Sequence, residues 1–223
     1  MKINIAIDGP SAAGKSSVAN AIAKELGYTH LDTGAMYRAV AYEAFKENIA
    51  IDDEENIVKM IDKMNLDMKP DGRVILNDED ISDKIRTNEI SMGASNVSKL
   101  LGCRAALVKM QQKICEAGGY ILDGRDIGTV VLKDAPVKIF MTASAEARAD
   151  RRVKQNKEKG IEGDDYDMIL QEIQKRDYQD SHRVNSPLKK ADDAVELDTS
   201  NISKEETIKI VMDLVRSKIG DQL

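Results

Sequence analysis

Short apolar runs alternate with amphipathic segments along the chain. The first run, residues 3–7, is continuous and β-branched, as in a strand buried on both faces, and residues 15–26 then carry helical periodicity. The same patterns predict further strands at 28–31, 120–123, 137–141 and 194–197, and helices at 35–46, 103–116, 145–160, 166–182 and 204–218. Strands that alternate with helices indicate an α/β fold with a mostly parallel sheet.

The pattern changes between about residues 51 and 98, where charged residues become more frequent. Within this stretch, "LDMKPDGRVILN" at 66–77 predicts two strands around a Pro-Asp-Gly turn. The length of the chain suits one domain with insertions better than two independent domains. We therefore expect a hairpin-bearing insertion at 36–103 within a single domain whose core is 1–35, 104–147 and 164–223.

Composition narrows the class of protein. Of the 223 residues, 42% are hydrophobic and 32% charged, and the net charge of −6 argues against nucleic-acid or anionic membrane partners. Two cysteines and two histidines argue against a structural zinc site and fit a reduced compartment. The opening "MKINIAIDGP" lacks the pattern of a signal peptide, and no run approaches the roughly 20 apolar residues of a membrane span. We expect a cytoplasmic protein.

A phosphate-binding motif follows the first predicted strand. "GPSAAGKS" at 9–16 matches G-x-x-x-x-G-K-[ST] and opens the first predicted helix, so backbone N–H groups and the helix N-terminus can cradle phosphates. Lys15 is expected to reach the β- and γ-phosphates of a nucleoside triphosphate as a catalytic residue, and the Ser16 hydroxyl to bind Mg²⁺. The predicted donor-binding residues are Gly9, Pro10, Ser11, Ala12, Ala13, Gly14, Lys15, Ser16 and Ser17.

This motif alone leaves several classes of protein open. A switch GTPase needs an Asn-Lys-x-Asp base reader, and the nearest string, "NKEK" at 156–159, ends in the wrong charge. A motor ATPase usually needs a longer chain and a strand that ends in adjacent acids, which 120–123 matches only in part because Gly-Arg follows. A small-molecule kinase and a non-catalytic ATP-binding module stay open.

Arginines recur near the predicted strand ends and along helix faces of this acidic chain. The guanidinium group binds phosphate bidentately and stays charged when partly desolvated. A triphosphate donor and a monophosphate acceptor would together account for the arginines. They are Arg38, Arg104, Arg125, Arg148, Arg151, Arg152, Arg176 and Arg183.

Five segments carry a resemblance to a known family: "DGPSAAGKSS", "LDTGAMYR", "DGRDIGTVV", "DAPVKIF" and "RDYQDSHR". Together they make the chain similar to the bacterial cytidylate kinases, P-loop nucleoside monophosphate kinases that act on CMP and dCMP. The resemblance covers nearly the whole chain, including the hairpin-bearing insertion that distinguishes the family from adenylate kinase. It implies a five-stranded sheet with helices on both faces, transfer of the γ-phosphoryl group of ATP with Mg²⁺, a role in pyrimidine nucleotide metabolism, and a monomer.

The resemblance also implies which residues hold the acceptor's phosphate. Thr33, Arg38 and Arg125 would bind it and Arg183 would join them, with Arg125 also counted as catalytic. Thr33 stands where the family commonly has Ser, which keeps the hydroxyl. For Arg38, the alternative is an ion pair on a helix surface.

Recognition of the cytosine base is implied in the same way. Cytosine presents an amino donor beside two acceptors, so Asp126 would accept from the amino group while Ser95 and Arg104 serve the acceptors. Uracil has a carbonyl in place of the amino group and would face an unmatched carboxylate, which predicts a preference for CMP over UMP. Without the resemblance, Ser95 and Arg104 are equally well explained as ordinary helix residues.

Two charged helix faces complete the implied site. Arg176 and Asp180 would contact the acceptor's ribose; alternatively, together with Arg183, they form a solvated ladder of ion pairs.

Arg148, Arg151 and Arg152 share one helix face, and the resemblance implies a lid at 148–163 with hinges at glycines 160 and 163. Arg148 and Arg152 would then assist catalysis and Arg151 would bind ATP. The alternative is an exposed basic face.

The implied reaction needs no general base. The acceptor's phosphate has a second pKa near 6 and is largely dianionic at neutral pH. Lys15, Mg²⁺ and the lid arginines would offset charge while the acceptor arginines align the nucleophile. Asp123 would orient water bound to Mg²⁺; its alternatives are a helix cap or a partner for a neighbouring arginine.

Overall fold

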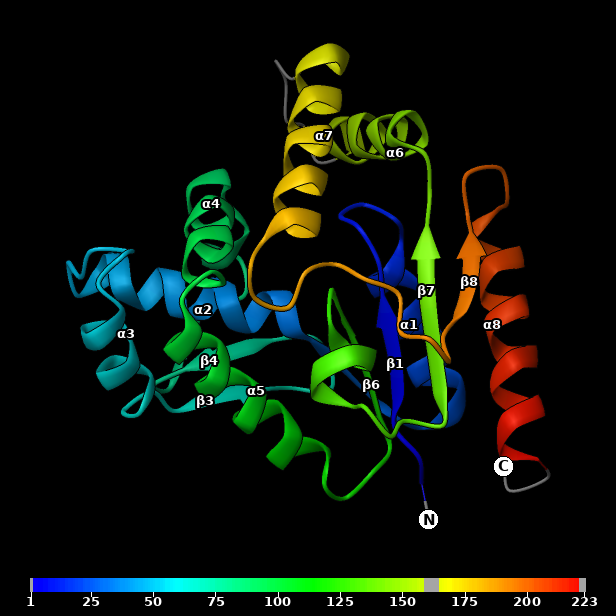
Figure 1. Cartoon of the computed structure of the whole chain (residues 1–223), viewed down its shortest axis with the longest axis horizontal. Coiled ribbons are helices and arrows are strands. Elements are labelled where there is room, and N and C mark those ends of the chain that lie inside the picture. The colour runs from blue at the N-terminus through cyan, green and yellow to red at the C-terminus, as the bar shows by residue number, and fades with distance from the viewer. Residues whose placement is uncertain (1, 159–164, 221–223) are drawn as a thin grey trace.

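The computed structural model describes residues 2–158 and 165–220, and these form a parallel sheet with helices on both faces (Figure 1). Within the described ranges the sheet has five strands in the order β2-β6-β1-β7-β8. Their bounds are β1 (Ile5–Asp8), β2 (Thr29–Asp32), β6 (Tyr120–Gly124), β7 (Val137–Thr142) and β8 (Val195–Asp198). Every pairing in this sheet is parallel, which confirms the predicted α/β class.

Alternation along the strands creates one apolar cluster on each face of the sheet. Ile5 and Ile7 of β1 pack with α1 (Lys15–Leu26) and α8 (Lys204–Ile219), whereas Ala6 faces α2 (Thr33–Lys46) and α5 (Leu101–Cys115). Ile5, Ala6 and Ile7 are fully buried. A strand buried on both faces needs apolar side chains pointing both ways, as these three consecutive residues provide.

The insertion forms a second, smaller unit beside α2. The strands β3 (Leu66–Met68) and β4 (Val74–Leu76) pair antiparallel, as predicted, and β5 (Glu79–Asp80) adds a short third strand. The same unit holds α3 (Glu54–Ile61), a 3₁₀ turn (Lys84–Arg86) and α4 (Asn88–Val97). α2 contributes side chains to both this unit and the main core, so the predicted boundary at residue 36 stays a prediction.

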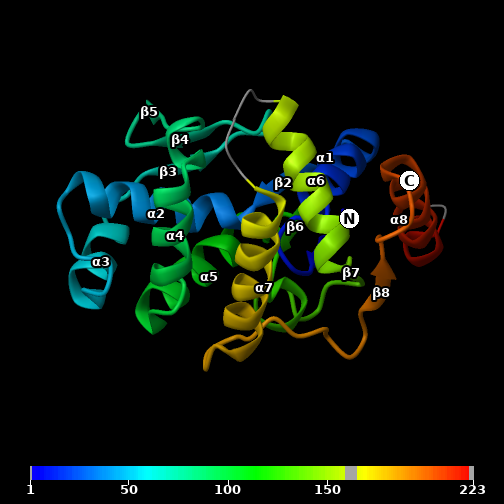
Figure 2. The ribbon, with the colours of Figure 1, turned by 90° about the horizontal axis from the view of Figure 1, so that it is seen from above.

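Two helices lie above the carboxyl ends of the strands. These are α6 (Ala145–Glu158) and α7 (Tyr166–His182), and Figure 2 shows them between the insertion and the β7–β8 side of the sheet. They pack together through Ala149, Ile169 and Ile173. The expected hinge glycines at 160 and 163 lie outside the described residues. The carboxyl ends of β1, β2 and β6 meet at one edge of the sheet under these helices, where ligands of parallel sheets usually bind.

Candidate active site

The loop after β1 has the backbone of a phosphate cradle. Gly9 has φ +147°, and a Cβ there would lie 2.0 Å from the Met141 carbonyl oxygen, so only glycine fits. Gly14, also left-handed, is the N-cap of α1 and has no side chain to bond the first amides of the helix. These N–H groups are therefore open to an anion.

Lys15 lies buried at the floor of this loop. Its Nζ donates to the Pro10 carbonyl at 2.7 Å. Burial, followed by the positive charge of Arg125, lowers the pKa of Lys15 to about 7. A bound anion would restore the ammonium's charge, which is the electrostatic role expected of this lysine.

Ser16 and Asp123, the two residues predicted to bind metal, are in contact. Ser16 Oγ donates to Asp123 Oδ2 at 2.8 Å, and His30 Nε2 lies 2.6 Å from Asp123 Oδ1. Burial would raise the pKa of Asp123, but the hydrogen bond and charge of His30 hold it below its usual range. Sequence reasoning missed His30, which stands two residues before the Asp32 of "LDTGAMYR". A hydroxyl and a carboxylate are the hard oxygen donors that suit Mg²⁺ beside phosphate.

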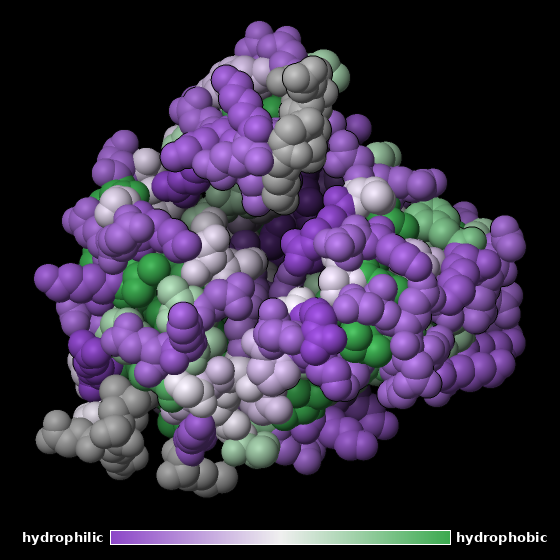
Figure 3. Space-filling view, turned by 180° about the vertical axis from the view of Figure 1, so that it is seen from behind, coloured by the Kyte–Doolittle hydropathy of each residue, from purple (hydrophilic) through white to green (hydrophobic). Residues whose placement is uncertain are grey.

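Beside the loop is a cavity of about 240 Å³ that Ser11, Lys15 and Ser16 help to line. Seen from behind, the surface carries a hollow with hydrophilic walls near the middle of the molecule (Figure 3). The cavity's other walls come from the end of β2, α2, α4, α5, the end of β6 with the loop after it, Arg152, α7 and the residue after α7. All nine residues predicted to bind the acceptor line it: Thr33, Arg38, Ser95, Arg104, Arg125, Asp126, Arg176, Asp180 and Arg183.

Carboxylates in the cavity are already held by arginines. Arg104 pairs with Asp126, and the nearest nitrogen of Arg183 lies 3.8 Å from the other oxygen of Asp126. Arg125 Nε donates to Asp180 Oδ2 at 2.7 Å, an ion pair that joins the loop after β6 to α7. Burial acts against ionisation of Asp180, but Arg125 keeps its pKa below the usual range. These pairs pre-orient both carboxylates toward the cavity.

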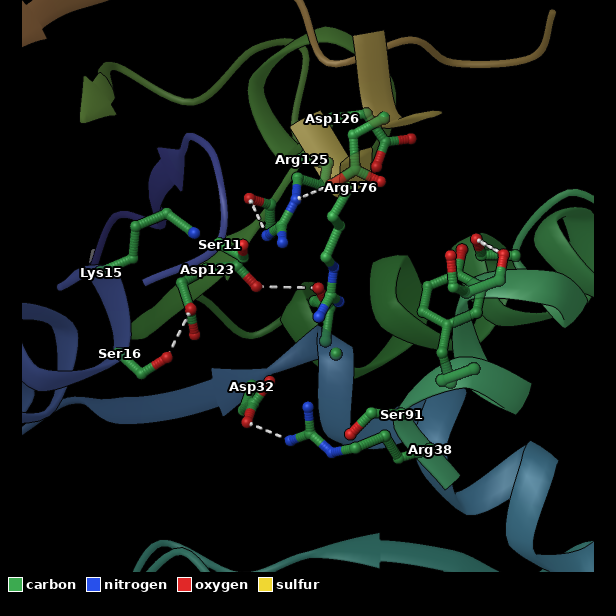
Figure 4. Close-up of a pocket in the computed structure, with 18 of the residues that line it drawn as sticks. Ser11, Lys15, Ser16, Asp32, Arg38, Ser91, Asp123, Arg125, Asp126 and Arg176 are labelled. Atoms are coloured by element: carbon green, nitrogen blue, oxygen red, sulfur yellow. Dashed lines mark hydrogen bonds and ion pairs between the residues drawn. The ribbon is translucent and has the colours of Figure 1, made fainter. Parts of the chain in front are cut away.

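Three buried guanidinium nitrogens around the cavity have no hydrogen-bond partner among the described residues. They are Arg38 Nε, Arg176 Nε and Arg183 Nη2. Arg38 forms an ion pair with Asp32 at 2.8 Å and also lines the cavity. Arg176 points into the space between Arg38 and Lys15 (Figure 4). Burial lowers the pKa of Arg176 to about 10, helped by Arg125. Buried donors without partners are costly, and an anion would satisfy them.

The Thr33 hydroxyl already has a hydrogen-bond partner within the protein. Thr33 Oγ1 donates to the Asp123 carbonyl at 2.8 Å, so its hydroxyl hydrogen is directed at the protein and away from an acceptor. Thr33 is also the first residue of α2, whose N-cap is Asp32. Backbone N–H groups at this helix N-terminus are thus the better candidates for contact with phosphate.

A second cavity, of about 510 Å³, lies on the other side of the phosphate loop. The loop residues from Ala12 to Ser17 line it together with Arg151 and Thr199. Arg151 donates to the hydroxyl and carbonyl oxygens of Thr199, whose hydroxyl lies 3.3 Å from the Ala13 carbonyl. Arg151 thus sits on the donor side of the loop.

Arg148 departs from the expectation of a lid arginine. It is buried, lines neither cavity, and donates to both Asp177 oxygens and to the Ser11 carbonyl at 3.3 Å. The helix face that carries it packs on α7, so Asp177 takes the bidentate contact expected of phosphate. Arg152 is exposed and lines both cavities, which is the position expected of an arginine near the transferring group.

Sequence reasoning also missed several residues of the lining. Tyr37, Ser91 and Ser98 also line the cavity of about 240 Å³, called the acceptor cavity below because the residues predicted to bind the acceptor line it. Tyr37 lies within the segment "LDTGAMYR". The two serines repeat Ser95 at helical spacing on α4, a signal that could have found them. Across the described ranges, no three His, Cys, Asp or Glu side chains gather as metal ligands.

Comparison with known proteins agrees with this geometry. The family model described as cytidylate kinase matches residues 5–217. A cytidylate kinase of Caldicellulosiruptor bescii is 49% identical over 100% of this chain and 99% of its own, and one of Bacillus velezensis is 44% identical over 97% and 98%.

Two solved structures share the fold at low sequence identity. An uncharacterized protein from Eubacterium ventriosum has a TM-score of 0.56 at 12% identity, covering 97% of this chain and 99% of its own. Shikimate kinase from Bacteroides thetaiotaomicron has 0.50 at 10%, covering 96% and 98%. These two establish the α/β fold alone, whereas the family match and the sequence relatives span the whole site: the chain belongs to the cytidylate kinase family.

Proposed function

We propose that this protein transfers the γ-phosphoryl group of ATP to CMP and dCMP, giving ADP and CDP or dCDP. The observation that carries the proposal is the set of three unpartnered guanidinium nitrogens, among the described residues, in a cavity that opens onto the phosphate loop. A nucleoside monophosphate supplies acceptor oxygens for them, and charge-assisted hydrogen bonds of this kind are strong. Family membership supports the same substrate.

On the donor side, the loop amides and Lys15 would bind the triphosphate while Arg151 borders the donor cavity. Ser16 and Asp123 fit Mg²⁺ and would hold it. When bound, the ion would supply charge neutralisation at the β- and γ-phosphate oxygens. Lys15 would then leave the Pro10 carbonyl for the phosphates, which make a stronger partner.

On the acceptor side, Arg38, Arg125 and Arg183 would hold the phosphate with the N-terminus of α2. Asp126 would accept from the cytosine amino group beside its Arg104 partner, with Ser95 on the facing helix. Arg176 and Asp180 would contact the ribose. Since a uracil carbonyl would oppose the Asp126 carboxylate, CMP is preferred over UMP.

The phosphoryl transfer itself is an alignment problem. The acceptor's phosphate is already largely dianionic near neutral pH, so one of its oxygens attacks without a base. The acceptor arginines would place it in line with the γ-phosphate, and Lys15 and Arg152 would offset the charge that develops. Exclusion of water from the acceptor position makes ATP hydrolysis slow in the absence of CMP.

A coupled ADP assay with CMP, dCMP, UMP and AMP, each with ATP and Mg²⁺, tests the proposal. We expect turnover with CMP and dCMP, much less with UMP and AMP, and slow hydrolysis of ATP alone. Equal turnover of AMP, or ADP formation from ATP that CMP does not accelerate, would contradict it.

We also propose a cytoplasmic monomer that uses Mg²⁺ and has neither a nucleic-acid nor a membrane partner. The acidic net charge supports this. Across the described part of the chain, no helix is both long and apolar enough to cross a bilayer. Light scattering during size-exclusion chromatography tests the monomer, and a mass of twice 24.6 kDa would contradict it.

A further inference from the structure

Asp8 occupies the junction between the two halves of the site. It is the last residue of β1, precedes the Gly9 that opens the phosphate loop, and is 4% exposed. Its neighbours in the sheet are Gly124 of β6 and Phe140 of β7. A buried carboxylate at the end of a central strand needs hydrogen-bond donors or cations beside it, because burial of the charge without them is costly.

The partners of Asp8 are two consecutive backbone amides. The Ile127 N–H donates to Oδ1 and the Gly128 N–H to Oδ2, both at 2.7 Å. These amides begin a short π-helical turn (Ile127–Val131) that follows β6. Each carboxylate oxygen thus takes one donor, an arrangement that a single ionised side chain can make and a neutral one cannot.

The turn held by Asp8 carries two residues of the acceptor cavity. Arg125 and Asp126 lie between β6 and the amide of Ile127, and both line the cavity. The turn closes through the Val130 N–H, which donates to the Asp126 carbonyl at 2.9 Å. Asp8 therefore ties the segment that faces the acceptor to the strand that leads into the donor loop.

We propose that Asp8 is a positioning residue: its carboxylate fixes the amides of Ile127 and Gly128 and thereby aims Arg125 and Asp126 at the acceptor nucleotide. The inference rests on the proposed function, because it takes CMP as that acceptor. It assigns Asp8 no contact with either substrate. Its effect is on acceptor affinity, while the loop that binds ATP keeps its own backbone contacts.

Protonation of Asp8 would weaken this anchor. Burial raises the pKa of Asp8 to about 6 against the opposing effect of the two amides, with Asp126 raising it further and Lys15 lowering it. Lys138 of β7 also approaches, since its side chain lies beside Gly128. The carboxylate is ionised at pH 8 and increasingly protonated below pH 6. A protonated acid has one free acceptor for two N–H donors.

The test compares Asp8→Asn with wild type and with a matched control, Asp62→Asn, at the exposed end of α3. At pH 8 we expect the KM for CMP to rise about tenfold or more in Asp8→Asn, as for loss of a charge-assisted hydrogen bond, with ATP affinity within about threefold. The control should match wild type. An unchanged KM for CMP in Asp8→Asn, with wild type active, would overturn the inference alone.

A pH series sharpens the test. The ratio of the two KM values, Asp8→Asn over wild type, should fall toward one between pH 8 and pH 5.5, because wild-type Asp8 becomes neutral too. Titration of CMP itself cancels in the ratio. A raised ratio that does not change with pH would mean that Asp8 stays ionised throughout this range, and would overturn the pH dependence but not the positioning role. Wild-type protein that does not phosphorylate CMP at all would overturn the proposed function, and this inference with it.

A second measurement needs no variant. In ¹H–¹⁵N spectra of the wild-type protein, the amides of Ile127 and Gly128 should shift together with a midpoint near pH 6, as their acceptor gains a proton. Amide positions that stay constant from pH 5 to pH 8 would overturn the pH dependence, even if Asp8→Asn failed to fold.

Discussion

The donor loop and the acceptor cavity adjoin each other and are built in opposite ways. The loop is a contiguous stretch, 9–17, whose backbone amides are available to bind phosphate. Its lysine, Lys15, donates a hydrogen bond to the carbonyl of Pro10 in the same loop. Apart from the loop residues that border it, the cavity is made of side chains from separate segments between Asp32 and Arg183. Backbone sites tolerate change in neighbouring side chains, whereas a side-chain site depends on the fold to bring its members together.

The two regions also differ in whether their cationic side chains have hydrogen-bond partners within the protein. Lys15 has an internal acceptor and a pKa lowered to about 7. Arg38, Arg176 and Arg183 each keep one buried nitrogen without a partner among the described residues. We therefore expect substitutions in the loop to slow the chemical step, and substitutions in the cavity to change acceptor affinity and selectivity.

The largest effect should follow from Lys15→Ala. Loss of a cation at the transferring group should lower kcat by about 10³-fold or more while the KM for CMP changes little. Steady-state kinetics and a melting curve would check both the loss and the retained fold, with exposed Lys24→Ala as control. A comparable loss of CMP binding would contradict this expectation, because it would mean that Lys15 acts on the acceptor as well as on the donor.

Arg125→Ala should raise the KM for CMP by about a hundredfold, since the change removes a charged donor and leaves Asp180 without its partner. Turnover should fall as well, and the ATP dissociation constant, measured by calorimetry, should stay within about threefold. Arg216→Ala, which removes an exposed ion pair with Glu25, is the control. Weakened ATP binding would instead assign Arg125 to the donor side.

Asp126→Asn should narrow the preference for CMP over UMP by about tenfold, because the amide can donate to a uracil carbonyl. The ratio of kcat/KM values for the two acceptors measures this. Asp67→Asn, on the exposed hairpin, should leave the ratio alone. If Asp126→Asn also leaves the ratio of kcat/KM values unchanged, Asp126 does not contact the base.

The smallest predicted effect is the uptake of a fraction of a proton by Lys15 when ATP binds. Burial lowers the pKa of Lys15 to about 7, so above pH 7 the free protein carries this side chain mainly neutral. ATP favours the charged form, and its binding at pH 8 should therefore take up a fraction of a proton. Calorimetry in two buffers of different ionisation enthalpy measures the uptake, which Lys15→Met should abolish. Equal uptake in both proteins would mean that Lys15 is already charged.

The sequence predicts the donor loop well because that site is local. Its motif, its strand and the start of its helix at Lys15 are contiguous, and the structure has them as expected. The acceptor residues were named through the family resemblance, but their partners were not. Arg125 pairs with Asp180 across 55 positions and His30 with Asp123 across 93, and no periodic pattern spans such distances.

The remaining differences between prediction and structure have two physical causes, a short element and contacts with distant segments. β5 escaped prediction because two residues are too short to show alternation. The resemblance implies that Arg148 faces phosphate together with Arg151 and Arg152, which share its helix face, but α7 brings Asp177 to it. Asp8 meets amides that lie 119 and 120 positions away, which no local pattern indicates. For Arg148 and Asp8, the missing information was the position of a distant segment.

The most direct test is a crystal structure with CMP bound. The account predicts the phosphate of CMP in the cavity beside the donor loop, with oxygens within hydrogen-bond distance of Arg38 Nε and Arg183 Nη2, and the cytosine amino group on Asp126. A CMP phosphate bound elsewhere, with both nitrogens still unpartnered, would contradict it.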